Sequence, residues 1–308
     1  MKRTTLALLI SGILSSGCVI KPPQYNLLKK SHFSFSKMYQ MCHDNKFDID
    51  TRCINSQKTL DSIVNSSYAI INRAKYILPK YAPKAAKAYF NKMHTVLGKD
   101  GLLPVNSGTA VMLPKGYMVS CKHVFKEKLK PLTFNYGPAK IYFAFPLSQH
   151  YFVRINGDEY PITVVKRAKN IDAILLKVKL PLNLNPKPIK KSNLSGLKPG
   201  ALIYLAGNTK TNGIQLKKGI VSKKDALMKL FINLNKEGAK RIKGIFGADI
   251  FSTLGDSGCP AYLIRDGKPE LAGLVRSINH KYGNMVDILR IDYIDRALNL
   301  TKKGILEP

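Results

Sequence analysis

The chain has 308 residues, a length that allows one large domain or two modest ones. Hydrophobic residues make up 45% of it, which is ordinary for a globular protein and excludes wholesale disorder. Lysine and arginine number 50 against 19 aspartate and glutamate residues, so the formal net charge is +31. The basic residues are spread along the chain in short pairs, whereas nucleic-acid binders more often concentrate them on one helix or arm, so no nucleic-acid partner is expected. A solvated basic surface and a surface that attracts anionic polymers or membranes both fit this composition.

The first eighteen residues have the layout of a secretory signal. Lys2-Arg3 is followed by the mostly apolar run Thr4–Leu14, which is too short to span a bilayer well, and then by small residues up to Cys18. This ending resembles a bacterial lipoprotein signal, in which the cysteine is acylated, although Ser15 stands where such signals prefer leucine. We expect export to the cell envelope or periplasm, with a lipidated Cys18 as membrane anchor. Ordinary cleavage near Gly17, with release of a soluble protein, is the alternative.

The cysteine count fits export, because the four cysteines left after lipidation of Cys18 could pair in an oxidising compartment. Cys42 and Cys53 lie eleven residues apart in one polar segment and are the first expected disulfide. Cys121 and Cys259 would form the second pair. The alternative for this second pair is two small buried residues with free thiols.

Residues 19–98 are predicted to be a tether followed by a helical region. Apolar residues between Leu60 and Ala74 are roughly helix-spaced, and Lys84–Leu97 is rich in alanine and lysine, which favour helix. Pro79 suits a helix stop, and Pro83 suits the first turn of the second helix. The region contains no catalytic constellation, so a spacer or a module that packs on the following domain is the expected role.

From residue 99 to the end, short β-prone runs alternate with glycine, proline and asparagine, a pattern typical of barrels or a sandwich. Asp266-Gly267 between two apolar runs predicts a hairpin, and Ile291–Leu298 predicts a closing helix. The predicted strands are Gly108–Leu113, Lys140–Phe145, Tyr151–Ile155, Ile162–Val165, Ala173–Val178, Ala201–Leu205, Gly219–Ser222, Pro260–Ile264, Leu271–Val275 and Met285–Ile288.

Three separate positions in this β-rich region carry residues that amide hydrolysis requires. An apolar strand ends shortly before His123, Asp172 stands at the mouth of an apolar run, and Ser257 lies between glycines. A serine nucleophile needs a base beside it, the base needs a carboxylate, and the oxyanion needs preorganised N–H donors. Glycines on both sides of the serine allow a tight backbone in which consecutive N–H groups point at one spot.

The motifs around these residues resemble those of trypsin/chymotrypsin-like serine proteases, and more closely their bacterial HtrA-like branch. His123 stands in a setting similar to Ala-Ala-His-Val, and Asp172-Ala173-Ile174-Leu175-Leu176 resembles the motif Asp-(Ile/Leu)-Ala-Leu-Leu. Gly255-Asp256-Ser257-Gly258-Cys259-Pro260 resembles Gly-Asp-Ser-Gly-Gly-Pro, with cysteine as its fifth residue. Leu197–Gly200 and Ala206-Gly207-Asn208 are similar to a further HtrA-like segment. The resemblance covers roughly residues 101–290.

This resemblance implies an all-β fold, a chymotrypsin-like double β-barrel over residues 99–308 behind the helical N-terminal segment. It also implies a serine endopeptidase that acts on polypeptides through an acyl-enzyme, without a metal or an organic cofactor. Ser257 would be the nucleophile, His123 the base and Asp172 the acid that orients it. The N–H groups of Gly255 and Ser257 would form the oxyanion hole. The rival interpretation is a catalytically silent protease-like binding module of the cell envelope, and an esterase with the same three residues is a third.

The chain also departs from the family pattern. Trypsin-like enzymes are activated when a freed N-terminal Ile or Val pairs with the acid before the serine, here Asp256, and nothing before Gly108 resembles that activation sequence. Asp256 is therefore expected to have another partner or a local role. Phe251 occupies the base of the specificity pocket, which excludes a simple Arg/Lys preference and favours a small or apolar side chain, or a closed pocket. Only 51 residues follow Ser257, too few for the PDZ domain of HtrA proteins.

Overall fold

The computed structural model describes residues 44–48, 57–97, 102–125, 129–136, 139–180, 189–209, 212–223, 244–279 and 285–306. The predicted signal, the predicted lipidation of Cys18, the predicted tether and the predicted disulfide between Cys42 and Cys53 fall outside these residues. Within the described part, no helix has the length and apolar character needed to cross a membrane.

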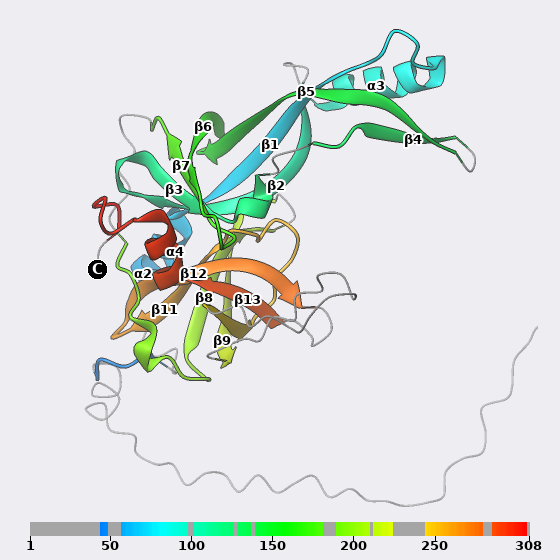
Figure 1. The fold of residues 1–308 in the computed structure, drawn as a ribbon. Helices are drawn as coiled ribbons and strands as arrows, with labels where there is room; N and C mark the ends of the chain where they lie inside the picture. The colour runs from blue at the N-terminus through cyan, green and yellow to red at the C-terminus, as the bar shows by residue number, and fades with distance from the viewer. Residues whose placement is uncertain are drawn as a thin grey trace, which may run out of the picture.

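Two antiparallel β-barrels, stacked one above the other in Figure 1, form the body of the molecule. In the first barrel, six strands close into a ring because the first of them pairs with both of its neighbours, and β4 extends the sheet beyond the ring. In ring order these strands are β1 (Ser67–Ile77), β2 (Leu102–Leu113), β3 (Tyr117–Ser120), β7 (Ile174–Val178), β6 (Asp158–Arg167) and β5 (Ala139–Ile155), with β4 at Leu132–Tyr136.

The second barrel is also a closed ring of six strands. In ring order they are β10 (Ile245–Asp249), β13 (Met285–Arg290), β12 (Lys268–Asn279), β11 (Pro260–Arg265), β8 (Leu202–Asn208) and β9 (Ile214–Lys223). Every residue of β8 is buried, and so are the first five of β11, which means that both faces of these strands are covered. One continuous hydrophobic cluster runs through both barrels, so the two barrels form a single packed body.

Three α-helices lie in the described part of the chain: α2 (Gln57–Asn65), α3 (Lys84–Leu97) and α4 (Ile291–Leu298). The predicted helices at the positions of α3 and α4 are confirmed. Helix α4 ends at Asn299, which adopts the left-handed conformation (φ 61°) and donates its N–H to the Asp295 carbonyl. Short 3₁₀ turns are η2 (Pro114–Gly116), η3 (Lys122–Val124) and η4 (Leu194–Gly196).

The helix prediction is wrong for residues 67–77, which form β1. Strand β1 pairs with β2 and β5, and without it the first barrel could not close. Its burial alternates along much of its length, so the apolar residues that looked helix-spaced also fit the period of a strand. The first barrel therefore begins at Ser67, and the predicted domain boundary at residue 98 is also wrong.

The predicted hairpin at Asp266-Gly267 is confirmed. Both residues have positive φ, 50° and 72°, as a two-residue type I′ turn requires, and they join β11 to β12. The short segment 44–48 docks on this hairpin before the chain enters the first barrel. The Asn45 N–H donates to Asp266 Oδ1 at 3.0 Å, and the Asp48 N–H donates to the Ile264 carbonyl at 2.9 Å.

An arm projects from the first barrel and consists of residues 74–97, 102–103, 132–136 and 139–147 (Figure 1). It contains the end of β1, helix α3, β4 and the start of β5. A small core of its own holds it together, formed by Ala74, Tyr76, Ala86, Phe90, Leu103 and Ala144. The arm also exposes large apolar side chains, namely Ile77, Tyr81, Tyr89, Tyr142, Phe145 and Leu147.

Candidate active site

His123 and Asp172 are brought together by the pairing of the strands beside them. His123 lies in η3 just after β3, and Asp172 lies just before β7. Because β3 and β7 are antiparallel partners, with Ser120 opposite Ile174, the end of one meets the start of the other. The His123 ring Nδ1 lies 2.6 Å from Asp172 Oδ2, and the His123 backbone N–H donates to Oδ1 at 2.9 Å. This two-point contact fixes the orientation of the imidazole.

The Asp172 carboxyl is kept ionised by its neighbours. Burial alone would raise its pKa, but the hydrogen bonds and charge of His123, with a contribution from Arg276, outweigh burial and hold this pKa below its usual range. The Arg276 Nε lies 3.6 Å from Asp172 Oδ2. The side chain of His123 remains 44% exposed while that of Asp172 is 15% exposed, so the imidazole faces solvent and its partner does not.

Ser257 lies in the loop between β10 and β11, at the junction of the two barrels. The Thr109 N–H, from the first barrel, donates to the Ser257 carbonyl at 2.9 Å. The Gly258 N–H and the Cys121 thiol both donate to the Val275 carbonyl, at 2.8 and 3.2 Å. The serine loop and the segment that leads to His123 thus bind the same carbonyl oxygen, that of Val275 in β12.

Gly108 shows how closely the histidine and serine segments approach. A Cβ atom added to Gly108 would lie 2.7 Å from a Val124 methyl carbon and 3.0 Å from the Ser257 carbonyl oxygen. The residue after His123 and the serine itself therefore pack around this one glycine. At Gly258, with φ 82°, an added Cβ would lie 2.3 Å from the Thr109 carbonyl oxygen, so a side chain is excluded there as well.

Gly255, the second predicted oxyanion-hole residue, has φ 99°, a conformation that glycine adopts without strain. Its carbonyl accepts a hydrogen bond from Thr109 Oγ1 at 2.8 Å, and Thr109 Oγ1 in turn accepts from the Asn208 N–H at 2.9 Å. Thr109 therefore ties β2, β8 and the serine loop together. Sequence reasoning missed this role, because a threonine inside a predicted strand carries no signal for it.

Asp256 has a partner that the sequence did not reveal. Its carboxylate is 1% exposed and forms an ion pair with Lys217, whose side chain is 9% exposed. Oδ2 also accepts from Ser252 Oγ at 3.0 Å and from the Thr253 N–H at 2.7 Å, while Oδ1 accepts from Thr209 Oγ1 at 3.3 Å. The open question about Asp256 is resolved in favour of a specific partner, a lysine of β9.

The predicted disulfide between Cys121 and Cys259 is wrong, because both cysteines are free and buried. The Cys121 thiol donates to the Val275 carbonyl, whereas the Cys259 thiol donates to the Pro260 carbonyl at 3.4 Å, so the two sulfurs have different surroundings. Burial raises the pKa of both thiols well above its usual value, which keeps them protonated and unreactive.

Among the described residues, one group of metal-ligating side chains comes close together. The sulfur of Cys121, a ring nitrogen of His123 and a carboxylate oxygen of Asp172 lie within 4.8 Å of one another. The protonated thiol and the neighbouring Arg276 cation both oppose a metal ion there. The arrangement fits a hydrogen-bonded His–Asp pair better than a metal site.

Phe251, the residue predicted to form the base of the specificity pocket, is 57% exposed. The Lys217 ammonium lies 5.6 Å from the centre of its ring. Its proposed influence on substrate preference stays a prediction.

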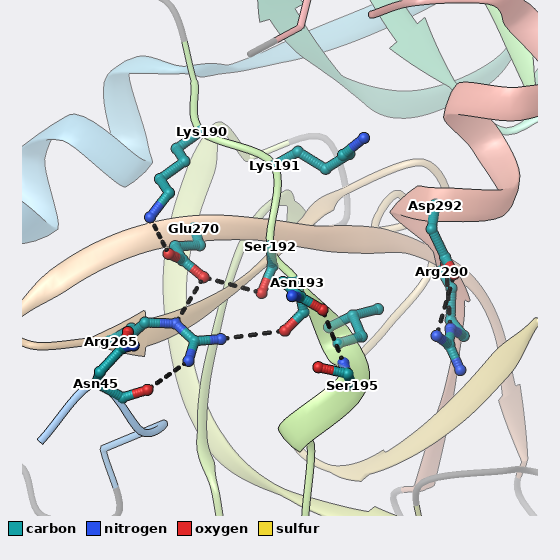
Figure 2. A pocket seen from close by; sticks show the side chains of 11 residues that line it. Asn45, Lys190, Lys191, Ser192, Asn193, Ser195, Arg265, Glu270, Arg290 and Asp292 are labelled. Atoms are coloured by element: carbon teal, nitrogen blue, oxygen red, sulfur yellow. Dashed lines mark hydrogen bonds and ion pairs between the residues drawn. The ribbon is translucent and has the colours of Figure 1, made fainter. Parts of the chain in front are cut away.

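A polar pocket of about 660 Å³ lies on the second barrel, away from His123 and Ser257 (Figure 2). Glu270 accepts hydrogen bonds in it from Lys190, Arg265 and Ser192, at 2.8, 3.2 and 3.1 Å. Arg290 is likewise paired with Asp292. Because these cations already have carboxylate partners, the pocket is a structural ion network, and nothing in it favours a particular ligand.

Two closed barrels with a His–Asp pair and a glycine-flanked serine at their junction define the chymotrypsin-like double-barrel class. Residues 107–273, more than half of the chain, match the family model of the trypsin-like peptidase domain, and the chain belongs to this family. No curated protein sequence matches the chain.

Solved structures of HtrA-type proteases are similar to the chain in fold. It is 14% identical to the HtrA-type protease AlgW with a decapeptide, with a TM-score of 0.53, and the match covers 82% of this chain and 69% of that one. In a second AlgW structure, with a tripeptide, the identity is 17% and the TM-score 0.49, and the match covers 80% of this chain and 62% of AlgW. The Rv3671c protease in an inactive form is 14% identical, with 83% and 96% covered and a TM-score of 0.49.

Proposed function

We propose that this protein is a serine endopeptidase that uses Ser257, His123 and Asp172. The observation that carries the proposal is the two-point contact between His123 and Asp172 beside the serine loop. A carboxylate that binds both the ring and the backbone N–H of a histidine holds the imidazole in one tautomer, as a general base next to a serine requires.

In the proposed reaction, His123 takes the proton of the Ser257 hydroxyl while the serine oxygen attacks the carbonyl carbon of the scissile peptide. The N–H groups of Gly255 and Ser257 bind the resulting oxyanion. The imidazolium, stabilised by Asp172, gives its proton to the leaving amine as the C–N bond breaks. Water then attacks the acyl-enzyme, with His123 again accepting a proton, and the acid product leaves as the serine hydroxyl reforms.

Polypeptides are the proposed substrates. The family assignment supports this, and the AlgW structures to which the fold is similar contain bound peptides. The exposed serine loop fits a macromolecular substrate, since Leu254 within it is 85% exposed.

Labelling of the purified protein with a fluorophosphonate tests the proposal. We expect labelling of the wild type, none of Ser257→Ala and strongly reduced labelling of His123→Ala, together with cleavage of an unfolded protein by the wild type alone. If the wild type neither labels at Ser257 nor cleaves, the alternative of a silent protease-like binding module is correct instead.

We further propose export to the cell envelope with Cys18 as a lipid anchor, on the basis of the signal-like first eighteen residues. Intact-mass analysis of envelope material tests this, and a mature chain that begins elsewhere than at Cys18 would exclude the anchor.

We also propose that the arm attracts anionic polymers of the cell envelope. No acidic residue occurs between Asp61 and Asp100, and five lysines of this stretch are exposed. They are Lys75, Lys80, Lys84, Lys87 and Lys92. Salt-dependent binding to an anionic polymer, lost when Lys84, Lys87 and Lys92 become glutamate, is the expected result, and equal binding by the variant would exclude this role.

A further inference from the structure

The acid next to the proposed nucleophile is buried together with a lysine from a distant strand. Asp256 precedes Ser257, and Lys217 lies in the middle of β9. Burial of a carboxylate without a cation is strongly unfavourable, so the position of Asp256 depends on this ammonium group. Both side chains are almost fully withdrawn from solvent, which makes the pair a fixed internal contact and not a surface ion pair.

The Asp256 carboxylate in turn holds the loop that carries the proposed oxyanion hole. Its side chain accepts from the Thr253 N–H, and its own N–H donates to the Thr253 carbonyl at 3.2 Å. Its carbonyl accepts from the Cys259 N–H at 2.8 Å. Gly255 and Ser257 lie between these fixed points, so the direction of their N–H groups depends on where the carboxylate sits.

The neighbouring strand leaves room for this arrangement. A Cβ atom added to Gly207 of β8 would lie 2.2 Å from Asp256 Oδ1, so no other residue fits there without moving the carboxylate. Lys217 is opposite Leu205 in the pairing of β8 with β9, two residues from Gly207 along the strand. The Phe251 ring lies near the ammonium on the solvent side.

We propose that Lys217 is a positioning residue that holds the oxyanion hole in its working form. Its internal ammonium group gives Asp256 the cation that a freed N-terminus supplies in trypsin-like enzymes. The protease is therefore competent without a cleavage just before Gly108 that would create a new N-terminus there. This inference rests on the proposed serine protease function and adds to it the way in which the site is switched on.

The first test compares fluorophosphonate labelling rates of full-length wild type, checked as uncleaved by mass spectrometry, with those of Lys217→Met. Loss of one oxyanion-hole donor costs about a hundred- to a thousand-fold in rate, and we expect the labelling rate to fall by that much. In steady-state cleavage of a peptide, the fall should appear in kcat more than in KM. Lys218→Met is the matched control, because Lys218 is the next residue and is exposed, and it should label at the wild-type rate. Equal rates for Lys217→Met and wild type would overturn the inference, as would labelling of the wild type only after cleavage before Gly108.

A second pair of variants separates positioning from folding. In Lys217→Met with Asp256→Asn, no buried charge is left unpaired, so the melting temperature should recover while the labelling rate stays low. Recovery of both would show that the pair serves folding alone. Should Lys217→Met not fold, Lys217→Ala with added propylammonium replaces it. We expect the added ammonium ion to raise the labelling rate of Lys217→Ala at least tenfold.

Hydrogen exchange distinguishes failure of this inference from failure of the proposed function. Lys217→Met should speed exchange of the amides in residues 252–258, whereas Lys218→Met should not. If the wild type does not label at Ser257 although this difference in exchange is seen, the proposed protease activity is wrong and the role of Lys217 in holding the loop stands. Unchanged exchange in Lys217→Met overturns the role of Lys217 whatever the activity.

Discussion

Asp172 and Asp256 are two carboxylates of the same site in opposite circumstances. Asp172 binds a histidine whose side chain is 44% exposed, so the imidazole can be reached from solvent. Asp256 binds a lysine that is 9% exposed and lies inside the barrel wall. In the proposed function, Asp172 serves the proton transfers of the reaction, while Asp256 serves the shape of the serine loop.

The largest expected effect comes from Asp172→Asn. The amide cannot hold the imidazole in the tautomer that accepts the serine proton, so kcat should fall by about ten-thousandfold, as in serine proteases generally. The melting temperature should change little, because His123 is half exposed. Steady-state kinetics beside thermal unfolding check this, and a loss below tenfold would show that Asp172 does not act on the histidine.

Asp256→Asn is expected to lower the stability of the protein much more than Asp172→Asn does. It leaves the Lys217 ammonium buried without a counter-charge, and breaking such a buried pair costs about 3–5 kcal/mol of stability. Urea unfolding of this variant beside Asp172→Asn measures the contrast. Equal stability of the two variants would mean that Asp256 and Lys217 do not form the buried ion pair that the structure shows.

Gly207→Ala tests the space in which the Asp256 carboxylate sits. The added Cβ would displace a carboxylate oxygen, so stability should fall by about 1–3 kcal/mol, the usual range for overpacking, and the labelling rate of Ser257 should fall too. Gly196→Ala is the matched control, since an added Cβ there has no neighbour within 4 Å. A Gly207→Ala protein that behaves like Gly196→Ala would contradict the close approach.

The smallest expected effect is in the acid range of pH. The pKa of Asp172 is lower in the folded protein than its ordinary value of 3.8, so its contribution to stability is present above that value. The contribution is lost as the pH falls through the lower, folded-state pKa. Urea unfolding between pH 6 and pH 3 should therefore show a steeper loss for the wild type than for Asp172→Asn. Parallel curves would contradict the lowered pKa.

Local patterns in the sequence predicted much of this architecture. The hairpin at Asp266-Gly267 and helix α4 depend on residues that are neighbours in the chain, and both were found. Strand β1 was missed because its apolar spacing fits two periods, and only its pairing with β2 and β5 decides between them. Tertiary context overrides local propensity in such a segment.

In the candidate site too, residues in local motifs could be predicted, whereas residues that depend on tertiary contacts could not. His123, Asp172 and Ser257 stand in short motifs that can be recognised one at a time. Lys217 could not be predicted, because 39 residues and the register of β8 against β9 separate it from Asp256, and a lysine in a lysine-rich chain is not distinctive. Thr109 was missed for the same reason, since its partners Asn208, Gly255 and Ser257 come from two distant parts of the chain.

The segment 44–48 has a consequence for how the molecule comes apart. Among the described residues, the chain contacts the hairpin of Asp266 in the second barrel before it forms the first barrel, and it forms the second barrel itself only afterwards. Residues that precede the first barrel therefore bind the second barrel, so the second barrel and this segment are not one contiguous piece of sequence. This arrangement favours cooperative unfolding, in which both barrels lose their structure in one transition and His123 and Ser257 are separated at the same time.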